Sequence, residues 1–190
     1  MRSPAELDVR PVTSARWKDL CTLFGAQGAC GGCWCMWARL PRAQYASGLG
    51  ATNKRRLHAL VKSGTPPGLL GYLRGEPVAW CSLAPRESFE RLERSRVMKP
   101  VDEQPVWAIV CLMVRKDMRG KGFSRAMIEG AAAFAKKHGA TIVEAYPTEP
   151  GAKRMADTFA WMGLANAYRS AGFAEVARRS KTRPVLRRAL

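Results

Sequence analysis

The most constraining feature of the sequence is a continuous apolar run, Trp107–Val114, that is followed by a basic, glycine-containing turn and a long amphipathic segment. A strand that is apolar at every position is typical of the centre of a sheet covered on both faces. From Phe123 to His138 the apolar residues recur with helical spacing, and Gly139 stands where a left-handed C-terminal cap is expected. The pattern predicts a central strand that leads through a turn into a helix packed on the sheet.

The other segments predict further strands and helices around this centre. Alternating or short apolar runs indicate strands, and apolar residues spaced by three and four indicate helices. Strands are expected over 7–13, 69–73, 78–83, 141–146, 173–177 and 184–190, and helices over 14–24, 53–61 and 153–171. Because nothing marks a second domain, the sequence predicts one mixed α/β domain over residues 1–190.

Two stretches do not fit regular elements. Residues 25–39 combine glycines with three cysteines and two tryptophans, which is typical of an irregular loop. Residues 85–105 are dense in Arg and Glu and contain Pro100 and Pro105. We expect a mobile surface excursion there, with a helical piece around 89–96.

Composition limits the classes of protein to which the chain can belong. Lys and Arg number 32 against 15 Asp and Glu, a net charge of +17 on 190 residues, while 47% hydrophobic residues are enough for a packed core. The positive charge favours anionic partners such as nucleic acid or phosphorylated cofactors. No run is long enough for a membrane-spanning helix, and the N-terminus lacks the apolar run of a secretory signal. We therefore expect a soluble cytoplasmic protein with no membrane partner.

The turn after the central strand carries the clearest chemical signal. Gly120 and Gly122 let the backbone approach an anion closely, and the helix that follows presents N–H groups and the positive end of its dipole. The side-chain cations of the turn are Arg119, Lys121 and Arg125. We expect the turn to hold a phosphate or pyrophosphate, the simpler alternative being a glycine turn on a basic surface.

Two common nucleotide motifs do not match this turn. A P-loop needs Ser or Thr directly after its Lys, but Lys121 is followed by Gly122. A dinucleotide fingerprint needs a third glycine at the position of Arg125. The turn therefore does not predict a nucleotide triphosphatase or a dinucleotide-binding protein.

The turn resembles the phosphate-binding signature of the GNAT superfamily of N-acetyltransferases, Arg/Gln-x-x-Gly-x-Gly/Ala. Arg119 and Gly122 match this signature, and Ser124 replaces its last residue with another small one. A second segment, Tyr168–Phe173, resembles the Tyr-x-x-x-Gly-Phe ending of the family. The two motifs occur in the family's order, and the resemblance implies a mixed, mostly antiparallel sheet flanked by helices.

The resemblance also implies a function and a set of binding residues. It implies an acyl-CoA-dependent N-acetyltransferase with acetyl-CoA as cofactor and a primary amine, in a small molecule or a peptide, as acceptor. Backbone amides of the turn would hold the pyrophosphate, and the end of the central strand would bind the pantetheine arm. The implied cofactor-binding residues are Leu112, Met113, Val114, Arg119, Gly120, Lys121, Gly122, Phe123, Ser124 and Arg125. GNAT domains often pair, which leaves a homodimer open.

Acetyl transfer to an amine needs a proton for the departing thiolate and hydrogen bonds for the developing oxyanion. A phenol with a pKa of about 10 can protonate a thiolate with a pKa of about 8.5, so Tyr168 is the expected acid. The simpler interpretation of Tyr168 is a core aromatic residue. A backbone N–H near Met113 or Val114 is expected to stabilise the oxyanion. Many family members have Asn seven residues before this Tyr, where this chain has Trp161.

The base that would deprotonate the amine has no clear signature. The central strand contains no carboxylate. Glu144 on the next strand is the first choice, with Asp102, Glu103 or a chain of water molecules as alternatives. The simpler interpretation of Glu144 is a solvated surface carboxylate.

The loop over 25–39 allows three interpretations. Cys30, Cys33 and Cys35 could bind zinc or an iron–sulfur centre, but a fourth ligand is missing at a supporting spacing. A reactive thiol that carries the acyl group is a second interpretation. We favour the third, a loop without metal whose apolar side chains line the acceptor pocket. The expected acceptor-binding residues are Trp34, Met36 and Trp37.

A binding protein is the alternative to an enzyme. The segment 178–188 is the densest basic run, and an RNA or ribosome contact there would make the chain a basic binding module or a non-catalytic GNAT-like domain. No aromatic residues are interleaved with these charges to stack on bases, so a solvated strand edge is the expected role of this run.

Overall fold

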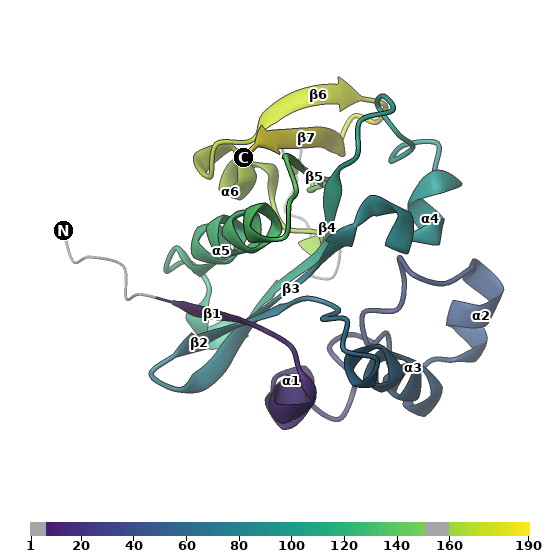
Figure 1. Cartoon of the computed structure of the whole chain (residues 1–190), viewed down its shortest axis with the longest axis vertical. Coiled ribbons are helices and arrows are strands. Elements are labelled where there is room, and N and C mark those ends of the chain that lie inside the picture. The colour runs from purple at the N-terminus through teal and green to yellow at the C-terminus, as the bar shows by residue number, and fades with distance from the viewer. Residues whose placement is uncertain (1–6, 151–159) are drawn as a thin grey trace.

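The computed structural model describes residues 7–150 and 160–190. In these residues seven strands form one sheet in the order β1-β2-β3-β4-β5-β7-β6 (Figure 1). Neighbouring strands are antiparallel except β4 and β5, which are parallel. The strands are β1 (Asp8–Pro11), β2 (Leu69–Leu73), β3 (Glu76–Pro85), β4 (Trp107–Val114), β5 (Ile142–Ala145), β6 (Ala174–Arg178) and β7 (Pro184–Ala189). The predicted mixed, mostly antiparallel α/β fold is confirmed.

The helices alternate with the strands. They are α1 (Trp17–Phe24), α2 (Arg42–Ser47), α3 (Ala51–Lys62), α4 (Glu90–Glu93), α5 (Phe123–Lys137) and α6 (Ala165–Ser170). Short 3-10 turns occur at η1 (Ser14–Arg16), η2 (Arg86–Ser88) and η3 (Lys116–Met118). The bounds of β2 and β4 agree with the prediction to the residue.

Two helix predictions need correction. The helix expected over 153–171 is α6 alone in the described part, because residues 161–162 form a turn, Leu164 forms an isolated bridge with Thr148, and residues 151–159 lie outside the described residues. Gly163 has φ +82° and Leu164 is extended, so α6 cannot continue back from Ala165 through these two residues. Helix α2 was not predicted, because its six residues bury none of their side chains and so carry no apolar stripe.

Helices cover both faces of the sheet. Side chains of β3 point alternately to the two faces, and each set packs against its own helices. Ala79 and Cys81 pack in one core with α5, and Trp80 packs in a second core with α1 and α3. Figure 1 shows α5 crossing the sheet, with α1, α2 and α3 grouped together below it. The centre of the molecule is therefore the β3–β4 pair, which is covered on both faces.

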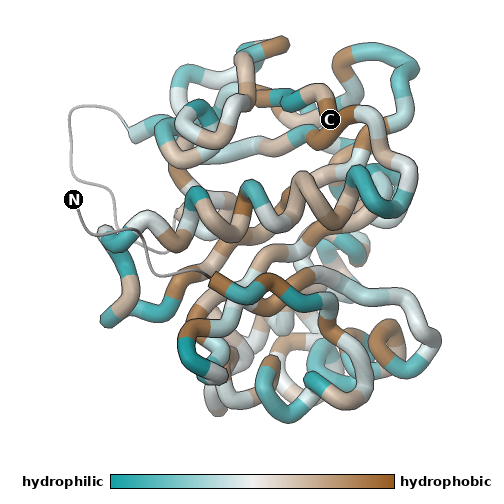
Figure 2. Tube along the Cα trace, turned by 60° about the vertical axis from the view of Figure 1, so that its left-hand side comes forward, coloured by the Kyte–Doolittle hydropathy of each residue, from teal (hydrophilic) through white to brown (hydrophobic). Residues whose placement is uncertain are grey.

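Helix α5 follows the predicted amphipathic pattern. Hydrophobic and hydrophilic segments alternate along its turns (Figure 2). The buried side chains are Phe123, Met127, Ile128, Ala131, Ala132 and Ala135. Lys136 and Lys137 lie in the last turn, where cations complement the helix dipole. The helix is fixed on the sheet by its apolar side, and this fixes the turn at its N-terminus.

The segment 85–105 is tied to the sheet at its first half. Phe89 and Leu92 are fully buried in a third core, together with Ala84 of β3 and Ala108 of β4. Burying side chains of this size stabilises the fold by about 1.5 to 3 kcal/mol each. The predicted helical piece around 89–96 is reduced to the four residues of α4.

Candidate active site

Strands β4 and β5 part halfway along β4. Their pairing ends with Ile109 opposite Ala145. The register between β3 and β4 also shifts here, because Ser82 lies opposite Cys111 and Leu83 lies opposite Ile109, which leaves Val110 as the extra residue of a bulge. A bulge bends its strand and increases the local twist. The last residues of β4 therefore keep β3 as a neighbour and separate from β5.

The backbone of this last part of β4 has two sides. The N–H of Arg115 donates to the carbonyl of Val78 at 2.8 Å, so by antiparallel alternation Met113 also directs its backbone groups toward β3. Leu112 and Val114 direct theirs away from β3, to the edge that β5 has left. Of the three β4 residues expected to bind the cofactor, two therefore offer backbone groups at this edge.

A short segment of the chain occupies part of the edge. The N–H of Leu112 donates to the carbonyl of Trp161 at 2.9 Å. A Cβ at Gly163 would lie 2.9 Å from Leu112 and 2.9 Å from the ring of Tyr168, so only a glycine fits between these two side chains. The sequence analysis did not identify the segment 160–163 as part of the site, because it predicted a helix there. Gly163 was the signal in the sequence that could have indicated a break in that helix.

The turn between β4 and α5 is open. Gly120 and Gly122 have φ of +72° and +84°, which favour glycine, and a Cβ at either position would meet no atom within 4 Å. Gly122 is the N-cap of α5, and its carbonyl accepts from Ala126 at 3.2 Å. The N–H groups of residues 123–125 precede this bond and have no acceptor within the helix. The turn presents backbone donors at the positive end of α5.

The cations of the turn are held beside these donors. Arg119 donates through Nε to the carbonyl of Val114 at 3.2 Å, and Lys121 donates through Nζ to the carbonyl of Asp117 at 2.9 Å. Arg125 forms an ion pair at 2.8 Å with the glutamate one turn later in α5. The structure thus brings the predicted phosphate-binding residues together in a single basic turn, with open space at its two glycines.

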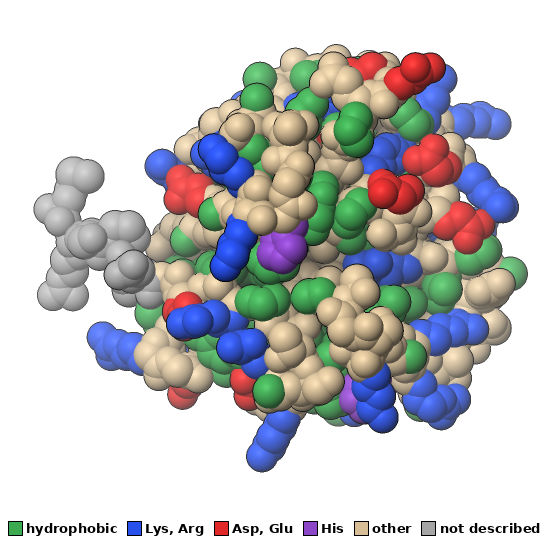
Figure 3. Space-filling model, in the orientation of Figure 1, with side chains coloured by type: hydrophobic (Ala, Val, Ile, Leu, Met, Phe, Trp, Pro, Cys, Tyr) green, Lys and Arg blue, Asp and Glu red, His purple; other side chains and the backbone are tan. Residues whose placement is uncertain are grey.

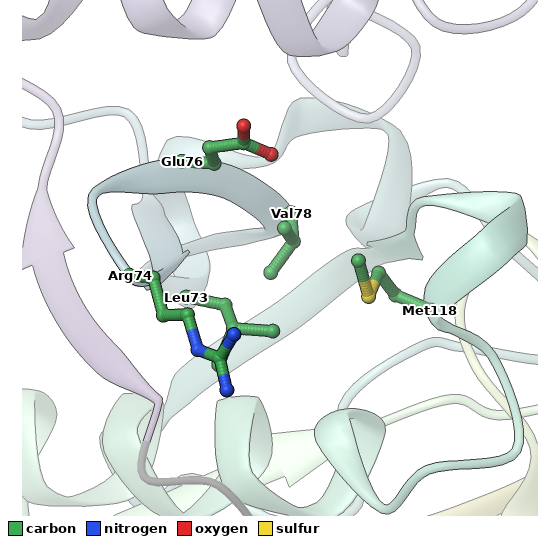
Figure 4. Close-up of a pocket in the computed structure, with 5 residues that line it drawn as sticks. All are labelled: Leu73, Arg74, Glu76, Val78 and Met118. Atoms are coloured by element: carbon green, nitrogen blue, oxygen red, sulfur yellow. The ribbon is translucent and has the colours of Figure 1, made fainter.

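A pocket of about 310 Å³ lies beside the turn, between the β2–β3 hairpin and η3. Leu73, Val78 and Met118 form its apolar lining, and Arg74 and Glu76 flank it from the hairpin (Figure 4). No residue of the predicted site lines this pocket. We assign it no part in the site.

Tyr168 lies in α6, on the far side of Gly163 from Leu112. Its side chain is fully buried, and its hydroxyl donates to the carbonyl of Met162 at 3.0 Å. Burial raises the pKa of Tyr168 well above that of a free phenol. The hydroxyl stays protonated at neutral pH and lies next to the edge of β4.

The three expected acceptor-binding residues occupy two environments. Trp34 and Met36 are each 3% exposed and belong to the core formed by α1, α3 and β3. Trp37 is half-buried and contacts Trp161 edge to face, with ring centroids 4.4 Å apart. The guanidinium of Arg91 lies over the Trp37 ring, 4.6 Å from its centroid. Only Trp37 of the three reaches the segment beside β4.

Glu144 is at the centre of a buried ionic network. Its side chain is fully buried; one carboxylate oxygen accepts from the hydroxyl of Tyr146, and the other accepts from Arg187 at 2.7 Å. Arg86 lies 3.8 Å from the first oxygen. These contacts link β5 to β7 and η2. The simpler interpretation of Glu144, a solvated surface carboxylate, is therefore wrong.

The basic C-terminal run is largely paired within the molecule. Arg178 forms ion pairs with Glu149 and Glu175, and Arg179 donates to the carbonyls of Lys99 and Pro100. Figure 3 shows Lys and Arg side chains spread over the visible face, with acidic side chains among them. The solvated strand edge expected for this run stays a prediction, with an RNA contact as its alternative.

The loop over 25–39 holds its thiols in different settings. Cys30 is exposed, Cys33 is half-buried and Cys35 is buried. Within residues 7–150 and 160–190, no group of three or more His, Cys, Asp or Glu side chains is arranged to hold a metal ion. The same described ranges contain no helix that is both long and apolar enough to cross a membrane.

Comparisons with known proteins agree with this geometry. The model of the Acetyltransferase (GNAT) family matches residues 34–163, which is more than half of the chain. A search of curated proteins found no significant match.

Solved structures share the fold at low sequence identity. The PaiA N-acetyltransferase of Thermoplasma acidophilum in complex with coenzyme A superposes with a TM-score of 0.53 at 11% identity, covering 97% of this chain and 99% of that one. A GNAT-family acetyltransferase of Listeria monocytogenes gives 0.59 at 11%, covering 97% and 95%. An agmatine N-acetyltransferase variant gives 0.56 at 14%, covering 97% and 100%. Likeness at this identity shows the fold alone, whereas the family match includes β4 and the turn over 119–125. The chain belongs to the GNAT family of acetyltransferases, whose cofactor is acetyl-CoA.

Proposed function

We propose that this protein is an N-acetyltransferase that transfers the acetyl group of acetyl-CoA directly to a primary amine. The observation that carries the proposal is the continuity of one edge. The backbone of β4 that is open beyond Ile109 leads straight into the open turn at Gly120 and Gly122, and Tyr168 lies beside the same edge. The N-acetyltransferases among the structures with this fold support an amine acceptor.

The basic turn suits the pyrophosphate of the cofactor. Its glycines leave open space, and the N–H groups of residues 123–125 point out of the helix at its positive end. The turn also supplies positive charge around this open space, from Arg119, Lys121 and Arg125. We propose that the pyrophosphate lies here and that Leu112 and Val114 bond the pantetheine arm through their backbone groups.

The segment 160–163 must give way for this binding. Its carbonyl at Trp161 occupies the N–H of Leu112. When the segment moves, the N–H of Leu112 becomes a donor at the edge, and the hydroxyl of Tyr168 loses its bond to Met162. Both groups are then available to the reacting atoms.

Bound acetyl-CoA supplies a thioester carbonyl and a thiolate leaving group. N–H groups at the β4 edge stabilise the negative charge that develops on the carbonyl oxygen. Tyr168, kept protonated by its buried setting, donates a proton to the departing sulfur. The side chains thus contribute orientation and one proton, without a covalent intermediate on the protein.

The contacts of Glu144 do not support its expected part as the base. Its oxygens accept from Tyr146 and Arg187 inside the sheet, where an amine has no path to them. We propose that Glu144 fixes β5 to β7 and that the amine loses its proton to solvent. We further propose that Trp37, rather than the buried Trp34 and Met36, contacts the acceptor.

The substitution Tyr168→Phe tests the proposal. We expect kcat with primary amines to fall about 100-fold while the Kd for acetyl-CoA changes less than about 2-fold. Coenzyme A release with a panel of diamines, amino acids and peptides measures kcat, and calorimetry measures Kd. Tyr72→Phe is the control, because its hydroxyl binds Asp19 on the far side of the sheet.

Unchanged turnover in Tyr168→Phe would exclude Tyr168 as the general acid. A folded wild-type protein that binds acetyl-CoA and acetylates none of these amines would contradict N-acetyl transfer.

A further inference from the structure

The loop before α2 holds one thiol in an unfavourable backbone conformation. Trp34 and Cys35 have φ of +43° and +55°, a region that non-glycine residues rarely adopt and that costs about 1 kcal/mol or more per residue. Both side chains are nonetheless buried, at 3% and 7% exposure. The fold over-determines this conformation, and its result is that the thiol of Cys35 lies against the centre of the sheet.

The thiol of Cys35 meets two donors on the sheet. The indole Nε1–H of Trp80 on β3 donates to its sulfur at 3.1 Å. Cys111 on β4 lies opposite Ser82, two residues along β3 from Trp80 and therefore on the same face. Cys111 packs against the core that contains Cys35 and Trp80, and interaction with its thiol lowers the pKa of Cys35. Two thiols from segments 76 residues apart in sequence thus share one core beside the β4 bulge.

A buried cation interacts electrostatically with the same thiol. Arg39 donates to the carbonyl of Pro67 at 3.1 Å and lies 4.6 Å from the ring centre of Phe89, but its buried Nε has no hydrogen-bond partner. Among the described residues no carboxylate forms an ion pair with Arg39, and Cys35 is the acidic group that interacts with its charge. A guanidinium in this setting favours an anion at Cys35.

The two thiols differ in acidity. The hydrogen bond from Cys111, followed by that from Trp80 and the charge of Arg39, lowers the pKa of Cys35 against the opposing effect of burial. The pKa of Cys111 is raised, first by its donation to Cys35 and then by burial. Of the nearby groups, Cys33 and Cys81 are thiols whose pKa is also raised by burial. Cys35 is therefore the group that forms a thiolate, and the thiolate is the reactive form of cysteine.

We propose that Cys35 and Cys111 form an oxidation site at which a peroxide joins them in a disulfide between the loop and β4. The Cys35 thiolate attacks a peroxide oxygen, the O–O bond breaks, and Cys35 sulfenic acid and hydroxide form. The Cys111 sulfur then attacks the sulfenic sulfur, and the new S–S bond releases the oxygen as water, with the Cys111 proton completing it. With hydrogen peroxide the sum is two thiols and one peroxide to one disulfide and two waters.

The second thiol distinguishes this site from an acyl carrier. A carrier of an acyl group needs one nucleophile, whereas Cys111 supplies the resolving thiol that a disulfide needs. Cys111 is half-buried and Cys35 is buried, so both thiols lie within the fold. Oxidation of the two thiols does not depend on the proposed function. An effect of the disulfide on acetyl transfer rests on the proposed function, because Cys111 precedes Leu112 in the edge proposed to bind the cofactor.

Peptide mapping of the full chain tests the site. Trypsin, which cleaves after Lys and Arg but not before Pro, places Cys35 in the peptide 19–39 and Cys111 in the peptide 97–115. After brief treatment of the folded protein with hydrogen peroxide, we expect the chain to lose about 2 Da. After the remaining free thiols are blocked and the chain is digested, we expect these two peptides to be linked, with reversal by dithiothreitol.

Substitutions identify which cysteines form the link. The peptide 19–39 also contains Cys21, Cys30 and Cys33, so a chain with all three replaced by Ser should still form the link. Cys35→Ser and Cys111→Ser should each abolish it. Cys81→Ser is the matched control, since it removes another buried thiol of β3 and should leave the link intact.

Two results would overturn the proposal. One is a folded wild-type chain in which peroxide oxidises the exposed Cys30 and no link between the two peptides forms. The other is a link that persists in Cys35→Ser. If peroxide lowers transferase activity and no link forms, the disulfide proposal fails and the proposed function stands. If the link forms in a protein that does not bind acetyl-CoA, the proposed function fails and the disulfide proposal stands.

Discussion

Two glycine-rich segments, the turn over 119–122 and the loop over 25–36, use glycine for opposite purposes. In the turn, a Cβ at Gly120 or Gly122 would meet no atom within 4 Å. In the loop, a Cβ at Gly28 would lie 2.2 Å from Nε1 of Trp34, and one at Gly32 would lie 2.4 Å from the backbone N of Gly50. The first segment leaves space that a ligand can take, and the second is filled by the protein's own indole and backbone.

The difference shows that a glycine must be interpreted by what surrounds it. Both segments have positive φ values at their glycines, and in the sequence both look like irregular turns. Only the three-dimensional surroundings separate a binding turn from a packed loop. Substitutions at matched glycines therefore give the sharpest tests of this contrast.

The largest effect is expected for Gly122→Glu. A carboxylate in the turn would fill the open space and repel the pyrophosphate, so we expect acetyl-CoA affinity to fall about 100-fold, or about 2.7 kcal/mol. Gly139→Glu is the matched control: Gly139 has φ +82° and open space as well, but it lies at the other end of α5. Calorimetric titration of both variants measures the affinities, and equal losses in the two would contradict the placement of the pyrophosphate.

A comparable effect on stability is expected in the packed loop. Gly28→Ala should lower the free energy of unfolding by about 2 to 4 kcal/mol, because the new methyl group overlaps Trp34 and the φ of +59° is strained. Gly31→Ala, with φ +52° and no atom within 4 Å, should lower it by about 1 kcal/mol. Urea unfolding measures both values. If the two variants lose the same stability, the loop is not packed as described.

A smaller effect on affinity is expected from the charge of the turn. Lys121→Met should weaken acetyl-CoA binding about 3- to 10-fold, and the loss should shrink in 0.5 M salt because exposed charges are screened. Lys137→Met, which removes a cation from the last turn of the same helix, should leave the affinity unchanged. A salt-independent loss in Lys121→Met would show that shape, and not charge, explains its effect.

The smallest effect is expected on the acidity of the loop thiol. The hydrogen bond from Cys111, with smaller contributions from Trp80 and the charge of Arg39, holds the pKa of Cys35 below its ordinary value. Alkylation of Cys35 by iodoacetamide should therefore persist as the pH falls below that value. Arg39→Gln should move the pH midpoint upward and slow alkylation at pH 7 about 2- to 5-fold. Arg39→Lys keeps the charge and should move the midpoint less. A midpoint that is the same in all three proteins would exclude Arg39 as its cause.

The parts of the site that are local in sequence could be predicted. The apolar run of β4, the two glycines of the turn and the stripe of α5 are set by neighbouring residues, and the structure places them as expected. The backbone bulge at Val110 carries no such signal. It arises from the pairing of β4 with β3, a long-range contact that a single segment does not encode.

The least predictable residues are those whose surroundings come from distant segments. Trp34, Met36 and Trp37 are neighbours of the same chemical kind, yet the first two are buried in a core and the third contacts Trp161. Glu144 is a charged residue in a short strand, and it is buried with a neighbouring partner, Tyr146, and two partners from distant segments, Arg86 and Arg187. Burial of this kind depends on tertiary packing, which composition and periodicity do not report.

Calorimetric titration of the folded wild-type chain with acetyl-CoA, with desulfo-CoA and dephospho-CoA titrated in parallel, tests whether the protein binds the cofactor. We expect micromolar binding of acetyl-CoA, and similar binding of desulfo-CoA because the pyrophosphate and the pantetheine arm carry the contacts. No binding of acetyl-CoA by a chain whose circular dichroism shows it to be folded would contradict the central claim that β4 and the turn over 119–125 hold this cofactor.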